Sequence, residues 1–154
     1  MSFEKVKHYF EKEGLGERVL EFAQSSATVE EAAQAAGCEE ARIAKTLSFL
    51  LSEETLLIVT AGDRKIDNKK FKAFFHQKAR MIPRDLVEER TGHQPGGVCP
   101  FATAPGVTVY LDESLKRFDT VYPAAGSGNS AVRLTPEELE RYSHSCGWID
   151  VCKE

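Results

Sequence analysis

The sequence predicts an α+β fold in which helices surround a curved or closed sheet. Short strand patterns lie between helical patterns, without the regular strand–helix alternation of a doubly wound protein. The 154-residue chain is 42% hydrophobic, which suffices for one domain with a core, and it contains no internal repeat or linker. We therefore expect a single domain over residues 1–154.

Capping signals place the helices. Thr28-Val-Glu-Glu31 is a capping box ahead of an Ala-rich helix that Gly37 ends, and Thr135-Pro-Glu-Glu138 repeats the signature. Asp67 is a candidate N-cap. Further helices are expected over residues 3–13 and 83–90, with a helical turn over 112–117.

The helix after Asp67 is expected to be amphipathic. Its aromatic side chains, Phe71, Phe74 and Phe75, should face the core, and its basic side chains, Lys69, Lys70 and Lys72, should face solvent.

The centre of the sheet is expected to be a hairpin of residues 41–49 and 56–60, joined by a polar turn. The second segment is almost continuously apolar, which is typical of a strand buried on both faces. Shorter strands are expected at residues 18–22, 80–81, 107–111, 120–122, 131–134 and 147–151.

Lys45 is an unusual residue on this hairpin. Side chains of a strand alternate between two faces, so Lys45 should share a face with Ile43, Leu47 and Phe49. A buried ammonium costs free energy unless an anion or hydrogen-bond acceptor meets it. The residue is therefore either a charged edge-strand device against aggregation or part of a site.

The loop of residues 96–100, Gly-Gly-Val-Cys-Pro, is the second candidate site feature. Its paired glycines allow backbone N–H groups to approach a ligand closely. It lies in a Gly- and Pro-rich segment, residues 92–105, which is either functional or a plain surface loop. Amides here could hold an ester carbonyl and the oxyanion formed on attack, and Lys45 could add a point charge for that oxyanion or for a phosphate.

Charge is uneven along the chain. The net charge of −4 argues against broad, non-specific nucleic-acid binding. Residues 61–84, however, contain eight Lys or Arg and two Asp, a local net charge of +6. This segment is either a solvated face or a docking patch for a phosphate backbone.

Several chemical classes are disfavoured. The sequence has no Gly-x-Ser-x-Gly elbow, Walker loop or His-Glu-x-x-His motif, and its four cysteines form no Cys-x-x-Cys pair, so no metal is expected. Cys99 with His93 is an alternative cysteine-hydrolase pair. A charged N-terminus and the absence of a long apolar run favour a cytoplasmic protein without membrane contact.

Five segments in order resemble the YbaK family, the free-standing deacylases related to the editing domain of bacterial prolyl-tRNA synthetase. They are Thr28-Val-Glu-Glu-Ala-Ala33, Ile43-Ala-Lys-Thr-Leu47, Ala61-Gly-Asp-Arg-Lys-Ile-Asp67, Gly96-Gly-Val-Cys-Pro-Phe101 and Gly126-Ser-Gly-Asn-Ser130. The resemblance spans about residues 28–139. The Lys-Thr-Leu segment combined with the Gly-x-x-x-Pro loop is its most specific part.

The resemblance implies a mixed, mainly antiparallel barrel-like sheet surrounded by helices, and hydrolysis of the ester of a mischarged tRNA. It implies Lys45 as the hallmark catalytic residue and no cofactor, with help in some members from the substrate's own ribose hydroxyl. The substrate-binding residues it implies are Gly96, Gly97, Val98, Cys99, Pro100, Ser127, Gly128 and Asn129. Cys99 and the Gly-Ser-Gly-Asn segment depart from some relatives and are candidate specificity positions.

The expected partners are the aminoacylated 3′ end of a tRNA, with Lys69, Lys70 and Lys72 as its docking residues, and an aminoacyl-tRNA synthetase. DNA is not expected as a partner. The rival interpretation is a non-catalytic module on the same scaffold that binds tRNA ends or a synthetase.

Overall fold

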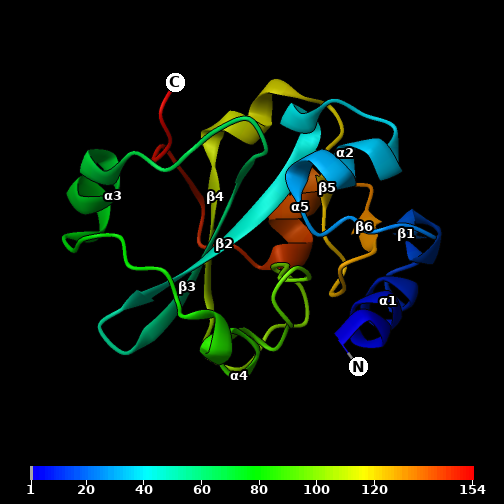
Figure 1. The fold of residues 1–154 in the computed structure, drawn as a ribbon, viewed down its shortest axis with the longest axis horizontal. Helices are drawn as coiled ribbons and strands as arrows, with labels where there is room; N and C mark the ends of the chain where they lie inside the picture. Colours follow the sequence, from blue (N-terminus) through cyan, green and yellow to red (C-terminus); the bar gives the residue numbers. More distant parts are fainter. Residues whose placement is uncertain (1) are drawn as a thin grey trace.

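A computed structural model describes residues 2–154 and shows helices packed around a curved sheet (Figure 1). The helices are α1 (Ser2–Lys12), α2 (Val29–Ala36), α3 (Asn68–Phe75), α4 (Val87–Thr91) and α5 (Pro136–Ser143). The strands are β1 (Val19–Glu21), β2 (Ile43–Leu51), β3 (Glu54–Ala61), β4 (Thr108–Asp112), β5 (Tyr122–Pro123), β6 (Ser130–Val132) and β7 (Trp148–Ile149).

The main sheet has the strand order β5-β2-β3-β4-β7. Its longest ladder is the antiparallel β2–β3 hairpin, which runs from Ala44 opposite Ala61 to Leu51 opposite Glu54. The β5–β2, β3–β4 and β4–β7 pairings are parallel. A two-stranded antiparallel sheet, β1–β6, continues the curvature through isolated bridges between the β5 and β6 regions. The predicted α+β class, the mixed sheet and the central hairpin are confirmed.

Both faces of β3 are buried, which explains its unbroken apolar sequence. Leu57 and Val59 belong to the largest core cluster, which includes Phe10 of α1. Ile58 points the other way and joins a second cluster under α3, with Phe71. The sheet is thus held from two sides, and β2 is fixed against the most deeply buried strand of the fold.

The helix termini follow the predicted caps. Both capping boxes are present, at Thr28 and Thr135, and Asp67 accepts hydrogen bonds from two backbone amides at the start of α3. Gly37 ends α2 in the left-handed conformation. The capping box places the start of α2, and with it residues 26–29, beside β2.

Two local expectations were wrong. Phe74 is 46% exposed, because α3 covers the sheet with Phe71 and Phe75 and turns Phe74 outward. The strand expected at residues 80–81 is only an isolated bridge between Phe49 and Met81. The helix expected over residues 83–90 is present, as a 3-10 turn, Arg84–Leu86, followed by α4, which ends at Gly92.

Two glycine-containing loops, residues 96–100 and 126–130, pack directly on each other. A Cβ added to Gly97 would lie 2.7 Å from the backbone N and Cα of Ser127 and 2.8 Å from the carbonyl carbon of Gly126. Neither backbone can give way without moving its loop. The two glycine motifs, far apart in sequence, therefore form one unit.

We predict that Gly97→Ala forces these loops apart and lowers the free energy of unfolding by about 1–3 kcal/mol, the usual cost of overpacking. Urea denaturation measures the change. Gly128→Ala is the matched control, since its Cβ would meet only Ala27 Cβ at 3.7 Å. Equal stability of the two variants would show that the contact is not tight in solution.

Candidate functional site

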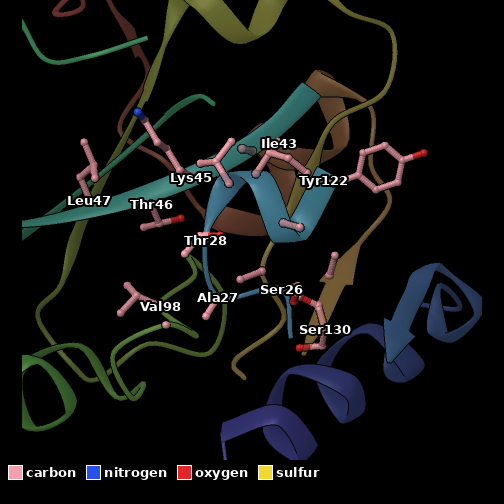
Figure 2. A pocket seen from close by; sticks show the side chains of 16 residues that line it. Ser26, Ala27, Thr28, Ile43, Lys45, Thr46, Leu47, Val98, Tyr122 and Ser130 are labelled. Carbon is pink, nitrogen blue, oxygen red and sulfur yellow. The ribbon is translucent and has the colours of Figure 1, made fainter. Parts of the chain in front are cut away.

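A cavity of about 240 Å³ lies between β2, the segment leading into α2, and the two packed loops (Figure 2). Its walls are residues 26–29 and Ala32, residues 43–47, Gly96 and Val98, and Tyr122, Ala124, Ser130 and Ala131. No Asp, Glu, His or Cys lines it. Lys45 is the one charged residue of its lining, and the cavity is otherwise a mostly apolar hollow with a few hydroxyl and amide groups, as in small-molecule sites.

The outer edge of β2 is unpaired where it borders this cavity. β5 pairs only with Ile43 and Ala44, and farther along the Ser48 carbonyl accepts from the Ile82 amide. Between these contacts the outward-facing peptide groups of Thr46 meet no strand among residues 2–154. The Thr46 hydroxyl oxygen is also buried without a hydrogen-bond partner. Such an edge can pair with the polar atoms of a bound molecule.

Only part of the 96–100 loop contributes to the cavity wall. Gly96, with φ +90°, and Val98 line it, whereas Gly97, Cys99 and Pro100 are buried behind. The Gly97 amide donates to the Gln94 carbonyl and is not available to a ligand. The Gly96 and Val98 amides make no hydrogen bond within residues 2–154, and they belong to the two loop residues that line the cavity.

Cys99 and His93 form a buried pair that is unsuited to nucleophilic catalysis. Both are 0% exposed, and Cys99 Sγ lies 3.5 Å from His93 Nε2. Because Nε2 lies 2.7 Å from the Phe101 carbonyl, which only accepts, it carries the hydrogen and offers no lone pair to the thiol. Burial raises the pKa of Cys99 to about 12. The cysteine-hydrolase alternative is therefore disfavoured by geometry and by protonation state.

The 126–130 loop supports the cavity from behind. Ser127 and Asn129 do not line it; Ser127 Oγ lies 2.6 Å from Ser130 Oγ and 2.9 Å from Asn129 Oδ1. The Asn129 side-chain amide donates to the Phe22 carbonyl at 3.1 Å, which ties the loop to the end of β1. Gly128 lies outside the lining, near Ala27. The loop's contribution to the wall is Ser130, which the sequence expectation omitted.

Lys45 lies on the cavity wall, but its ammonium points away from the hollow. Figure 2 shows the Lys45 and Thr46 side chains leaving β2 on opposite sides, with Thr46 toward Val98. Burial lowers the pKa of Lys45, and the nearby Cys152 and Asp63 oppose this shift. The structure thus brings the Lys45 backbone to the 96–100 loop and directs its amine to the other side of the strand.

The α3 lysines lie apart from the cavity. Lys69 and Lys72 are exposed, whereas the Lys70 ammonium is held by Asp150 at 3.0 Å and by the Cys152 carbonyl at 2.9 Å. Figure 1 shows α3 on the opposite side of the view from α2, whose first turn borders the cavity. A molecule touching both places must extend across the protein surface.

Residues 2–154 contain no group of three or more His, Cys, Asp or Glu side chains that could hold a metal ion. Within the same residues, no helix is long and apolar enough to span a membrane.

A family model for the aminoacyl-tRNA editing domain matches residues 23–142. The chain belongs to this family. The chain is 54% identical to the Uncharacterized protein YwhH of Bacillus subtilis over 155 residues, covering 100% of this chain and 99% of that protein. The matched range includes every segment that lines the cavity.

Solved structures agree with this membership. A crystal structure described as that of a candidate trans-editing enzyme for prolyl tRNA synthetase matches the chain with a TM-score of 0.89 and 30% identity, over 99% of this chain and 98% of that one. The hypothetical protein APE2540 matches with a TM-score of 0.85 and 29% identity, over 97% and 99%. The resemblance to the prolyl-tRNA synthetase editing group is confirmed.

Sequence reasoning missed Ser26, Thr46 and Ser130. Ser130 could have been predicted as a cavity residue, since it is the last residue of the Gly126-Ser-Gly-Asn-Ser130 segment. Thr46 follows Lys45 and occupies the other face of β2, but the unpaired strand edge beside it depends on where β5 ends. No local pattern indicates such an end.

We predict that iodoacetamide at pH 8 labels the exposed Cys146 of the native protein and leaves Cys99 unmodified, because a buried thiol with a pKa near 12 forms almost no thiolate. Mass spectrometry of the digested protein locates the label. Cys146→Ala removes the Cys146 signal, and denaturant exposes Cys99. Labelling of native Cys99 with loss of activity would restore it as a nucleophile.

Proposed function

We propose that the chain is an aminoacyl-tRNA deacylase that acts in trans on mischarged tRNA. The main support for this proposal is the cavity, where an unpaired strand edge at Thr46 faces a loop with free Gly96 and Val98 amides. Membership of the editing-domain family indicates which ligand such a hollow would receive. Acting on charged tRNA, the protein would work in the cytoplasm.

In the proposed reaction, water adds to the carbonyl carbon of the ester that joins the amino acid to the terminal ribose. Charge develops on the carbonyl oxygen, and fixed amide donors such as those of Gly96 and Val98 stabilise it. The bond to the ribose oxygen then breaks, releasing a free amino acid and a tRNA with its hydroxyl restored.

No side chain of the cavity wall is suited to act as the general base, because the wall lacks Asp, Glu, His and Cys. We infer that the neighbouring hydroxyl of the substrate's ribose orients the water and carries its proton. Catalysis would then depend on positioning and on electrostatic stabilisation of the oxyanion.

Lys45 would act as a cation for the phosphate backbone of the tRNA end. Its ammonium leaves β2 on the side away from the cavity, which suits a nucleotide phosphate outside the hollow better than the ester inside it. Lys65 lies close enough to lower the pKa of Lys45, and it adds positive charge there. A lysine in this role remains protonated throughout.

We predict that the purified protein releases amino acid from at least one mischarged tRNA in a panel that begins with tRNA for proline. Lys45→Met, which keeps an apolar stem in place, should reduce kcat/KM about 10- to 100-fold, the cost of losing a hydrogen bond to a charged group. Lys12→Met, an exposed lysine at the end of α1, is the matched control.

Binding of charged tRNA without release of amino acid would favour a non-catalytic module instead. Unchanged turnover in Lys45→Met would remove Lys45 from the mechanism. Circular dichroism separates either result from a failure to fold.

The lysines of α3 are proposed as a second contact for the tRNA. Lys69 and Lys72 are exposed, and Lys70 is partly neutralised by Asp150. A tRNA whose 3′ end enters the cavity would extend past α3 with its acceptor stem.

For this contact we predict that Lys69→Gln with Lys72→Gln weakens tRNA binding and lowers the slope of log K against log salt by roughly 0.7–0.9 for each lost phosphate contact. Fluorescence anisotropy across a salt series measures the slope. Lys70→Gln should change it less, because that ammonium is already held by Asp150. An unaltered slope in the double variant would identify α3 as a solvated face only.

A further inference from the structure

Two serine side chains lie together at one end of the cavity, and their hydrogen bonds determine what that end can bind. Figure 2 shows Ser26 and Ser130 at the end away from Lys45, Thr46 and Leu47. Ser130 is 2% exposed and Ser26 is 8% exposed. Their hydroxyls come from different elements, the segment before α2 and the first residue of β6.

The hydrogen of Ser127 is already committed. The Asn129 side-chain nitrogen faces the Phe22 carbonyl, an acceptor, so its oxygen Oδ1 faces Ser127 Oγ at 2.9 Å. Because Oδ1 carries no hydrogen, Ser127 must be the donor in that bond. The Asn129 backbone amide in turn donates to Ser127 Oγ at 3.4 Å.

It follows that Ser130 donates its hydrogen to Ser127. Their hydroxyl oxygens lie 2.6 Å apart, and Ser127 has no second hydrogen to offer. Ser26 likewise donates to the Ser130 carbonyl at 3.4 Å. The Ser130 hydroxyl therefore presents only lone pairs to the cavity, and the Ser26 hydroxyl, which makes a longer contact, can turn its own lone pairs to the same ligand.

We propose that Ser130, assisted by Ser26, binds the α-ammonium group of the aminoacyl ester; this inference rests on the proposed function. An ammonium has three donors and no acceptor, so it complements the Ser130 hydroxyl, whose hydrogen is already donated to Ser127, and the neighbouring Ser26 oxygen. A phosphate or carboxylate has only acceptor oxygens, so it could not form a hydrogen bond with a serine oxygen that also only accepts. No lysine or arginine lines this end, so no full positive charge repels a cation there.

The partial positive charge at the start of α2 opposes this assignment only weakly. Glu30 and Glu31 lie in the first turn of α2, and Glu31 accepts hydrogen bonds from the Thr28 amide and from Ser25. These carboxylates offset the helix dipole beside the serines. The surroundings of Ser26 and Ser130 therefore remain suited to a cation.

This assignment orients the substrate and defines its class. The amino acid would enter with its ammonium toward Ser130 and its terminal nucleotide toward the Lys45 end of β2. Esters whose amino group is replaced or acylated, as in peptidyl-tRNA, would lose the contact. The protein would therefore select tRNA that carries a single free amino acid.

The test uses the mischarged tRNA that the native protein hydrolyses, and its α-hydroxyacyl counterpart made by treating it with nitrous acid. We expect Ser130→Ala to lower kcat/KM for the aminoacyl ester about 10- to 100-fold, because a hydrogen bond to a charged group is lost. For the α-hydroxyacyl ester we expect a change of less than about threefold. Ser143→Ala, at a buried serine of α5 whose hydroxyl donates to the Glu140 carbonyl and which does not line the cavity, is the matched control.

The outcomes are distinct. Equal loss on both esters would show that Ser130 only supports the loop and would overturn the inference while leaving the proposed function intact. If the native protein hydrolyses no aminoacyl-tRNA, the proposed function and the inference fail together. Ser130→Thr, which keeps the hydroxyl, should retain the preference for the aminoacyl ester if it folds, and its circular dichroism and urea midpoint establish whether it does.

Discussion

The register of β2 against β3 determines where each chemically distinctive group of β2 lies. β3 is buried on both faces, and its apolar side chains hold the hairpin in one alignment because a slip of one residue would place them on the wrong sides. With that alignment fixed, Thr46 faces the cavity and Lys45 the opposite side. The short length of β5 then leaves the edge of β2 open beside the loops.

The site is assembled from segments that make few direct hydrogen bonds to β2. Its far wall consists of two loops that interlock at Gly97 and Ser127, and the start of α2 is fixed by its capping box. Each part is positioned by contacts outside the cavity, such as the Asn129 contact with Phe22. This arrangement leaves the inner surface with unpaired polar groups, the amides of Gly96 and Val98 and the hydroxyl of Thr46.

Much of the fold could be predicted from the sequence because its determinants are local. Capping boxes, the left-handed Gly37 and the apolar run of β3 each act within a few residues, and all were correct. Phe74 was assigned to the wrong face because a helix of two turns can bury only part of a broad aromatic stripe, and tertiary packing decides which part. Residues 80–81 were expected to form a strand, but only one bridge to Phe49 forms there.

The site was predicted less completely, for a different reason. Residue type singled out Lys45 and the glycine loop as candidates, but the direction of the ammonium, the hydrogen bond of the Gly97 amide and the hydrogen bond of the Ser130 hydroxyl depend on the three-dimensional arrangement of the loops. Alternation along a strand was applied correctly to Lys45. Alternation alone does not say whether Lys45 or Thr46 faces the 96–100 loop, because that depends on which side of the sheet the loop covers.

The β2 strand acts as a partition between two kinds of recognition. The consecutive residues Lys45 and Thr46 project to opposite sides of β2. In the proposed function, the phosphate groups of the ligand would therefore be bound on the Lys45 side and its acyl group on the Thr46 side. Substitutions that reshape the cavity on the Thr46 side would leave the contacts to the nucleic acid on the Lys45 side nearly unchanged. A lineage could thus exchange one rejected amino acid for another while retaining the same tRNA.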